Sequence, residues 1–315
     1  MKSPVLFIIF KRKDTTSRVF QRIREAQPPR LYIAADGPRP EKEGEAAKCE
    51  ATRQIVEHID WPCEVFRLYR DKNLGCGKGV SSAITWFFEH EEQGIILEDD
   101  ILPHLDFFRY CDEMLERYRD VHQVKCICGS NAFYEDIEYP YSYYFSHYMM
   151  VWGWATWRRT WKEYDRSLQS IPKDDFIRTV KNLPIKKGSK RMAMSIYETM
   201  TSDHPIDTWD YQLVFSIWHH DGLNIIPIHN LCKNIGFGHE DAAHTTDNSG
   251  KIDAHVVQTC YPLINPDHVK DVPNLDRITF MEMYLPSPSL KDRLKQQVYR
   301  LYSLLPSWVK KAVGK

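Results

Sequence analysis

The stretch GIILEDDILPHLDFFRY, residues 94–110, joins a short apolar run to three consecutive carboxylates and then to a pattern typical of a helix. The apolar run predicts a buried strand that ends where Glu98, Asp99 and Asp100 begin. Adjacent like charges repel one another, and their burial is costly unless a positive group compensates them. Three carboxylates at the end of a core strand therefore point to a bound cation.

The first 130 residues alternate short apolar runs with amphipathic segments, which predicts βαβ units that build a mostly parallel sheet flanked by helices. Between the first two runs, Val19, Phe20 and Ile23 share one helical face. The fold class is therefore α/β. The expected strands are Val5–Phe10, Leu31–Ala35, Glu64–Leu68, Gly94–Leu97 and Val124–Cys128.

The overall charge excludes one broad class of partner. The 315 residues include 42 basic and 43 acidic side chains, which leaves a formal charge of −1. This balance gives no field that would attract nucleic acid. The run VLFIIF near the N-terminus is too short for a signal peptide or a membrane span, and the eight cysteines form no CxxC pair. We therefore expect a cytoplasmic protein without a disulfide framework.

Polar and glycine-containing segments follow the predicted strands. FKRKD, ADGPR and YRDKNLGCGKG come after the first three strands, and EDD comes after the fourth. Ligands of such sheets bind at the carboxyl ends of the strands. Cations after the first and third strands, opposite carboxylates after the fourth, suit a nucleotide diphosphate bridged to a divalent metal. The alternative is ordinary solvated charge in loops.

The acidic triplet suits a hard cation such as Mn²⁺ or Mg²⁺. These ions prefer oxygen ligands, and one or two carboxylates together with substrate phosphates usually hold them. The alternative is that Asp100 or Asp106 only caps the helix that follows.

Four segments, in their order and approximate spacing, resemble the inverting N-acetylglucosaminyltransferase I family and related bacterial nucleotide-diphospho-sugar transferases. They are LEDDILPHLDFFRY, VWGWATWRRTW, TWDYQ and NIGFGHEDAAHT, and the likeness covers roughly residues 4–245. The resemblance implies a GT-A (Rossmann-like) fold with a smaller acceptor-side region. It also implies metal-dependent transfer of a sugar, with inversion, from a nucleotide-diphosphate donor such as a UDP-sugar to a hydroxyl of a glycan or lipid-linked glycan.

The resemblance also assigns roles to residues at the strand ends. It implies that Asp100 is the direct metal ligand and that Glu98 and Asp99 contact the donor sugar and ribose. Phe10 and Arg12 match positions that hold the base and phosphate. The remaining donor-binding candidates are Asp36, which matches an aspartate on the uracil, and Asn73 and Lys78, whose segment NLGCGKG departs from the family and looks more like other GT-A enzymes.

Asp210 in TWDYQ matches the family's catalytic base, although Tyr211 stands where the family has a second aspartate. In an inverting transfer the base lies opposite the leaving group, so its distance from the triplet in sequence is no obstacle. Asp207, three residues earlier, is a competing candidate. The alternative for Asp210 is a helix cap or an ion pair.

Histidines and aromatic residues add further candidates. The segment GFGHEDAAHT suits a loop that closes over the phosphates of the donor. His239 or His244 in this segment could contact the diphosphate or complete the coordination of the metal. Solvated loop histidines are the alternative. Twelve of the 29 residues from 133 to 161 are aromatic, which is more than one sugar site needs. Most therefore belong to the core, and we expect Trp154, together with Trp209 farther along the chain, to line the acceptor cleft.

The likeness and the change of composition along the chain divide it into three sections. Residues 1–130 form the nucleotide-sugar-binding half, 131–270 the acceptor-binding and catalytic half of the same unit, and 271–315 a C-terminal extension. Residues 290–315 of that extension hold seven basic side chains and one acidic one, and apolar residues recur among them every three or four positions from Leu290 to Trp308. This predicts a basic amphipathic helix, which either binds an anionic membrane surface peripherally or docks on the protein itself.

Two other classes of protein share parts of this pattern. A sugar-nucleotide pyrophosphorylase would have a glycine-rich loop after the first strand, whereas FKRKDTT contains no glycine. A non-catalytic carbohydrate-binding protein on the same scaffold would keep the aromatic residues and could lose Asp100 and Asp210, but both are present.

Overall fold

The computed structural model describes residues 1–131, 139–183, 187–239, 259 and 261–284. The expected basic amphipathic helix from Leu290 and the candidate His244 lie outside the described residues. Among the described residues, no helix is both long enough and apolar enough to cross a membrane.

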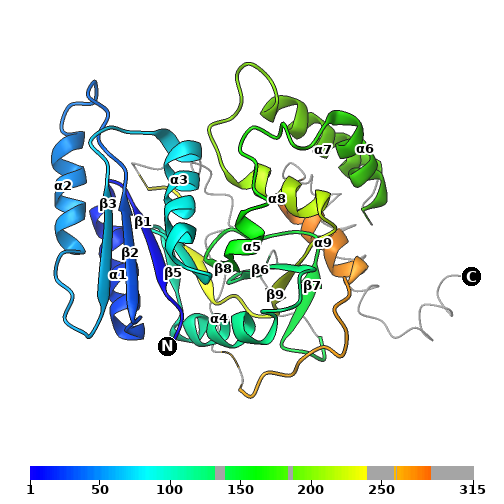
Figure 1. Ribbon diagram of the computed structural model, residues 1–315, viewed down its shortest axis with the longest axis horizontal. Helices are drawn as coiled ribbons and strands as arrows, with labels where there is room; N and C mark the ends of the chain where they lie inside the picture. The colour runs from blue at the N-terminus through cyan, green and yellow to red at the C-terminus, as the bar shows by residue number, and fades with distance from the viewer. Residues whose placement is uncertain (132–138, 184–186, 240–258, 260, 285–315) are drawn as a thin grey trace, which may run out of the picture.

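A single eight-stranded sheet runs through the molecule (Figure 1), with strand order β3-β2-β1-β4-β8-β6-β9-β7. All five strands expected from the sequence are present, within one residue at each end. The strands are β1 (Val5–Ile9), β2 (Arg30–Ala35), β3 (Glu64–Tyr69), β4 (Gln93–Glu98), β6 (Val124–Cys128), β7 (Tyr143–Ser146), β8 (Trp154–Trp157) and β9 (Leu223–Pro227).

The sheet is mostly parallel, as predicted. Strands β3, β2, β1 and β4 pair in parallel, and so do β6 and β9. Strand β8 lies antiparallel between β4 and β6, and β7 lies antiparallel to β9 at the edge. Two short strands, β5 (Ile101–Pro103) and β10 (Cys232–Asn234), form a separate antiparallel pair just beyond β4. The architecture is α/β, with a large, mostly parallel sheet flanked by helices, and is consistent with the expected Rossmann-like GT-A fold.

Helices cover both faces of the sheet and enclose two hydrophobic cores. One core packs under α1 and α4, and the other under α3, α5, α6 and α8. The helices are α1 (Lys13–Ala26), α2 (Glu45–Ile55), α3 (Gly75–His90), α4 (Leu105–Arg117), α5 (Arg158–Trp161), α6 (Lys173–Asn182), α7 (Lys187–Met200), α8 (Asp210–His219) and α9 (Pro273–Tyr284).

Alternation along β4 determines where the acidic triplet points. Ile95 and Leu97 belong to the core under α1 and α4, and Ile96 belongs to the core under α3 and α8. Because successive side chains of a strand face opposite sides, Glu98 turns toward α3 and Asp99 turns toward α1. The strand pattern thus sends neighbouring carboxylates to different partners.

Candidate active site

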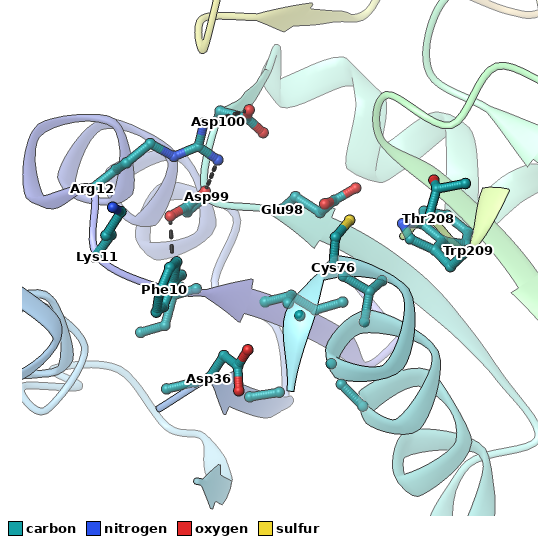
Figure 2. Close-up of a pocket in the computed structure, with 18 of the residues that line it drawn as sticks. Phe10, Lys11, Arg12, Asp36, Cys76, Glu98, Asp99, Asp100, Thr208 and Trp209 are labelled. Carbon is teal, nitrogen blue, oxygen red and sulfur yellow. Dashed lines mark hydrogen bonds and ion pairs between the residues drawn. The ribbon is translucent and has the colours of Figure 1, made fainter. Parts of the chain in front are cut away.

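A cavity of about 630 Å³ lies at the carboxyl ends of β1, β2 and β4. Figure 2 shows side chains from these strand ends, from α3 and from the segment before α8 around it. Nine of the twelve residues predicted as site residues line this cavity: Phe10, Arg12, Asp36, Asn73, Glu98, Asp99, Asp100, Trp209 and Asp210. The location agrees with the general rule for parallel α/β sheets.

Asp99 fixes the turn between β1 and α1. Its Oδ2 accepts hydrogen bonds from the backbone N–H of Phe10 at 3.4 Å and from the Thr16 hydroxyl at 3.5 Å, and its Oδ1 pairs with the Arg12 guanidinium. Its side chain is 4% exposed. Asp99 therefore positions Phe10 and Arg12 at the mouth of the cavity (Figure 2).

Asp100 also pairs with Arg12, with 2.9 Å between Oδ2 and Nη1. Burial disfavours the charged guanidinium, but Asp99 and Asp100 outweigh it and raise the pKa of Arg12 above its usual range. Gly236 packs against this pair so closely that a Cβ there would collide with the Asp100 carboxylate. The backbone N–H of Ile235 donates to the Asp100 carbonyl at 2.8 Å. The segment after β10 thus closes one side of the acidic triplet.

Glu98 points into the cavity toward Cys76 on α3 (Figure 2). Burial, with Asp100 and Asp99 close by, raises the pKa of Glu98 to about 8, and Asp210 contributes in the same direction. No ion pair with a lysine or arginine compensates Glu98 within the described residues. Its environment therefore disfavours a negative charge when no cation is bound.

The charges that line the cavity favour a divalent cation. Six carboxylates face four cationic side chains, and the latter are Lys11, Arg12, Arg39 and Arg70. A nucleotide diphosphate would add further negative charge to this excess. Carboxylate oxygens are the ligands that Mg²⁺ and Mn²⁺ prefer, so the residues present fit such an ion.

Asp36 stabilises the loop that leads into α3. Its carboxylate accepts hydrogen bonds from the backbone N–H of Leu74 at 3.0 Å, from the Asn73 amide at 2.9 Å and from the backbone N–H of Gly37 at 2.9 Å. Both Asp36 and Asn73 line the cavity near the end of β2. Their mutual hydrogen bond makes them one unit of the cavity wall.

Two cations flank Phe10. The Lys11 ammonium lies 5.6 Å from the ring centroid and the Arg39 guanidinium 5.9 Å from it. Both cations pair with the buried carboxylate of Glu45, which belongs to α2. Sequence reasoning missed Glu45, because it lies 34 residues after Lys11 in a segment rich in acidic residues, where nothing distinguishes it.

Asp210 is the first residue of α8 and lines the cavity. Its Oδ1 accepts hydrogen bonds from the Thr208 hydroxyl and from the backbone N–H of Tyr211, the latter at 2.9 Å. No hydrogen bond to its Oδ2 occurs in the part of the chain that the structure describes. One oxygen is thus held in place, and the other is available to the cavity.

Asp207 has a different environment. Both of its carboxylate oxygens accept hydrogen bonds of 2.9 Å from the backbone N–H groups of Cys76 and Gly77, in the first turn of α3. This arrangement caps α3 from a distant part of the chain.

Of the three remaining predicted positions, two lie outside this cavity. Lys78 is on the outward side of α3 and lines a second cavity with Tyr164 and Arg166. Trp154 is buried at 1% exposure and stacks on Trp209, with ring centroids 5.6 Å apart, so it supports the cavity wall from behind. The third position is His244, outside the described residues. In addition, the Nε2 of His239 lies 3.1 Å from Asp14 Oδ1 on α1.

Comparisons with known proteins add little. No family model and no curated protein matches the chain. Solved structures with partial likeness include mouse xyloside xylosyltransferase 1 in its apo form (9% identity over 72% of this chain and 85% of that chain, TM-score 0.37). UDP-glucose pyrophosphorylase complexed with UDP-glucose has 11% identity over 52% and 79% of the two chains, with a TM-score of 0.32. 4-Diphosphocytidyl-2C-methyl-D-erythritol synthase from Anaerococcus prevotii has 7% identity over 51% and 74%, with a TM-score of 0.31.

Proposed function

We propose that this chain is a metal-dependent glycosyltransferase that moves a sugar from a nucleotide-diphosphate donor to a hydroxyl of a glycan or lipid-linked glycan, with inversion. The observation that supports the proposal most is the single cavity at the strand ends, where nine residues predicted from sequence meet. A UDP-sugar is the donor that the family resemblance implies.

The donor would bind along β1 and β2. Phe10 offers an aromatic face to the base, and Lys11 and Arg39 beside it add positive charge. Asp36 and Asn73 would contact the uracil from the opposite wall. Asp99, which holds Phe10 and Arg12, would act mainly as a positioning residue, in addition to the ribose contact that the resemblance implies.

Asp100 and Glu98 are the residues that would hold Mn²⁺ or Mg²⁺, with Asp100 as the direct ligand. Such an ion stabilises the negative charge that develops on the departing diphosphate. Arg12, already paired with Asp100, would meet the phosphates of the donor. The two groups would together favour departure of the nucleotide.

Asp210 would accept the proton of the acceptor hydroxyl. Thr208 and the Tyr211 N–H orient its carboxylate, and its environment leaves one oxygen open to the cavity. Asp210 and Glu98 line the same cavity, and the charge of Asp210 contributes to the raised pKa of Glu98, which supports a role for Asp210 near the metal and the donor sugar. Trp209, beside it, lines the cavity but is buried and stacked on Trp154, so it would bound the acceptor site as part of its wall.

The structure around β1 disfavours the pyrophosphorylase alternative. Helix α1 begins at Lys13, four residues after β1 ends at Ile9. This connection leaves no room for a glycine-rich loop, and Arg12 within it is engaged with two carboxylates. For the C-terminal extension, we propose peripheral binding to an anionic membrane surface, where a lipid-linked acceptor would be found.

Release of nucleotide diphosphate tests the proposal. Purified protein is incubated with a panel of nucleotide sugars and Mn²⁺, with and without a chelator. We expect one donor to be hydrolysed slowly and turned over faster with a glycan acceptor, and the chelator to abolish both. A protein that binds sugars but releases no nucleotide from any donor would instead be the non-catalytic alternative.

A further inference from the structure

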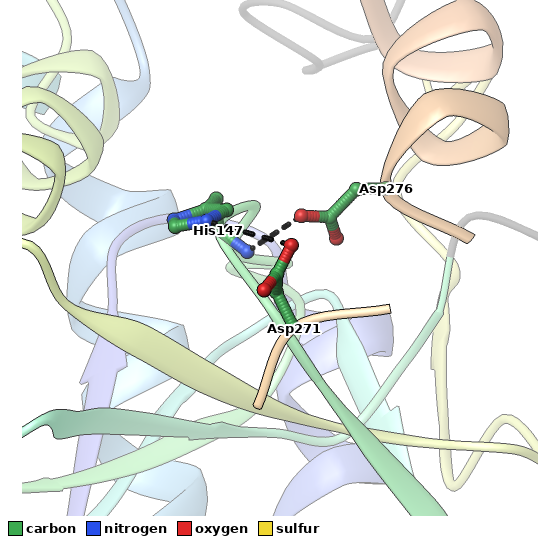
Figure 3. A group of neighbouring side chains, drawn as sticks. All are labelled: His147, Asp271 and Asp276. Atoms are coloured by element: carbon green, nitrogen blue, oxygen red, sulfur yellow. Dashed lines mark hydrogen bonds and ion pairs between the residues drawn. The ribbon is translucent and has the colours of Figure 1, made fainter. Parts of the chain in front are cut away.

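A second group of ionisable side chains lies away from the cavity (Figure 3). His147, Asp271 and Asp276 each bring one potential ligand atom within 4.8 Å of the other two. His147 directly follows β7, which pairs with the beginning of β9 through Ser146. Strand β9 is parallel to β6, and β6 runs in the same direction as β4 because β8 is antiparallel to both. The group therefore lies at the end of the sheet where the parallel strands begin, opposite to the end that carries the acidic triplet.

Among the described residues, no lysine or arginine pairs with the two carboxylates of this group. The Asp276 side chain is fully buried, and in the part of the chain that the structure describes its oxygens accept hydrogen bonds from two neutral donors, the Ser146 hydroxyl and the His147 backbone N–H at 3.2 Å. Burial, with Asp271 close by, raises the pKa of Asp276 to about 7. Buried carboxylates of this kind are stabilised by a bound cation.

The His147 imidazole suits a metal. Its Nε2 lies 3.9 Å from Asp271 Oδ2, which is too long for a hydrogen bond, and its buried Nδ1 makes no hydrogen bond within the described residues. Burial lowers the pKa of His147 and so favours the neutral ring, whose lone pair is the one that binds metals. Asp271, Asp221 and the Gly222 backbone act in the opposite direction, but burial outweighs them.

The backbone of all three residues is fixed. The His147 carbonyl accepts a hydrogen bond of 2.7 Å from the Trp218 indole. Asp271 forms a bridge with Phe145 of β7, and the Asp276 N–H donates to Val272 at 3.0 Å in the first turn of α9. A preorganised set of ligands is what a selective metal site requires.

We propose that His147, Asp271 and Asp276 form a second divalent-cation site, of a type that accepts imidazole and carboxylate together, such as Zn²⁺, Co²⁺ or Mn²⁺. Neighbouring ligands of a tetrahedral ion are about 3.4 Å apart, so the 3.9 Å between His147 Nε2 and Asp271 Oδ2 must shorten by about half an ångström, and the other separations, which are within 4.8 Å, by up to about 1.4 Å. The ion neutralises both carboxylates and ties the start of α9 to the end of β7. Its role is structural, because the site is remote from the cavity.

Co²⁺ binding to the full chain tests the site. The Asp100→Asn variant removes the proposed metal ligand of the cavity, so Co²⁺ that still binds this variant reports on the second site. The amount of bound Co²⁺ is measured by equilibrium dialysis and by its visible absorption. We expect one Co²⁺ per chain, with a melting temperature raised by a few degrees. Adding Asp271→Asn should weaken binding at least tenfold. The matched control is Asp267→Asn, which should bind Co²⁺ normally, because among the described residues the Asp267 carboxylate accepts a hydrogen bond from Tyr141 and takes no part in the proposed site.

Failure of this site is distinguishable from failure of the proposed function. The activity of Asp100→Asn bears on the proposed function alone. The second site is overturned if the Asp100→Asn protein binds no Co²⁺, or if adding Asp271→Asn leaves Co²⁺ binding unchanged. If Asp271→Asn does not fold, anomalous scattering from Co²⁺-soaked wild-type crystals decides. A peak between the three side chains supports the site, and a saturated crystal without that peak overturns it.

Discussion

The Asp207 carboxylate accepts a hydrogen bond of 2.9 Å from the backbone N–H of Gly77, 130 residues earlier in the chain. Its second oxygen binds the N–H of Cys76 in the same way. The segment before α8 is therefore joined to the first turn of α3, and both contribute to the cavity wall. Of the two aspartates that compete for the role of base, one is occupied as a helix cap, and Asp210 remains.

Replacing these two aspartates separates the roles. Asp210→Asn should lower the rate of transfer by about 10²–10⁴ while donor affinity changes less than twofold, because a general base acts on the acceptor. Asp207→Asn should keep most of the activity but lower the free energy of unfolding by about 1 kcal/mol, the usual effect of a lost helix cap. Steady-state kinetics, donor titration and urea unfolding measure the three quantities.

The contrary result is equally clear. If Asp207→Asn loses transfer at unchanged stability while Asp210→Asn stays active, the base is Asp207, and its contact with α3 must open during turnover.

Asp100→Asn tests the metal site. The amide keeps the size of the side chain but removes the charge that pairs with Arg12 and would bind Mn²⁺. We expect nucleotide release to fall at least 100-fold and donor affinity to lose its dependence on Mn²⁺. Asp71→Asn, exposed and outside the cavity lining, is the control. Wild-type activity in Asp100→Asn would sink the assignment of Asp100 as metal ligand.

The parallel part of the fold was predictable because its signals are local. Each of the five expected strands is a short apolar run, and the rule for strand ends accounts for seven of the nine candidates that meet in the cavity. The other two, Trp209 and Asp210, belong to the segment TWDYQ, which carries part of the family resemblance. Strand β8 was not predicted, since Trp154–Trp157 belongs to an aromatic stretch without a period. Its antiparallel position between β4 and β6 follows from tertiary pairing alone.

The misplaced candidates share a physical cause. Lys78 lies one helical turn into α3, and the rotation of that helix directs its side chain to the second cavity. The alternation of side chains along β8 turns Trp154 into the core, where it stacks on Trp209. Sequence indicated the correct segments, but the direction of a side chain depends on how its element is packed.

Gly236→Ala probes the closed side of the triplet. A Cβ at this position would collide with the Asp100 carboxylate and lie 2.9 Å from the Arg12 guanidinium, so one of them must move. We expect the concentration of Mn²⁺ needed for half-maximal activity to rise at least tenfold, with the overall fold retained. Gly188→Ala, where an added Cβ meets nothing within 4 Å, should behave like wild type. Unchanged Mn²⁺ dependence in Gly236→Ala would show that this approach is not needed for the site.

Glu45 gives a pH dependence of stability with a defined sign. Hydrogen bonds from Arg39, and further ones from Lys11, lower the pKa of Glu45 to about 2 in the folded protein despite its burial. Its contribution to stability is therefore complete above the unfolded pKa near 4.5 and is lost as the pH falls toward 2. Glu45→Gln should lower the free energy of unfolding at pH 7 by on the order of 1–2 kcal/mol and flatten its decline between pH 4.5 and 2. Urea unfolding at several pH values measures this, with Glu50→Gln on the same helix as control, because within the described residues the Glu50 carboxylate accepts a hydrogen bond from Gln54 and forms no ion pair. Parallel pH curves for wild type and Glu45→Gln would mean that the ion pairs beside Phe10 add nothing to stability.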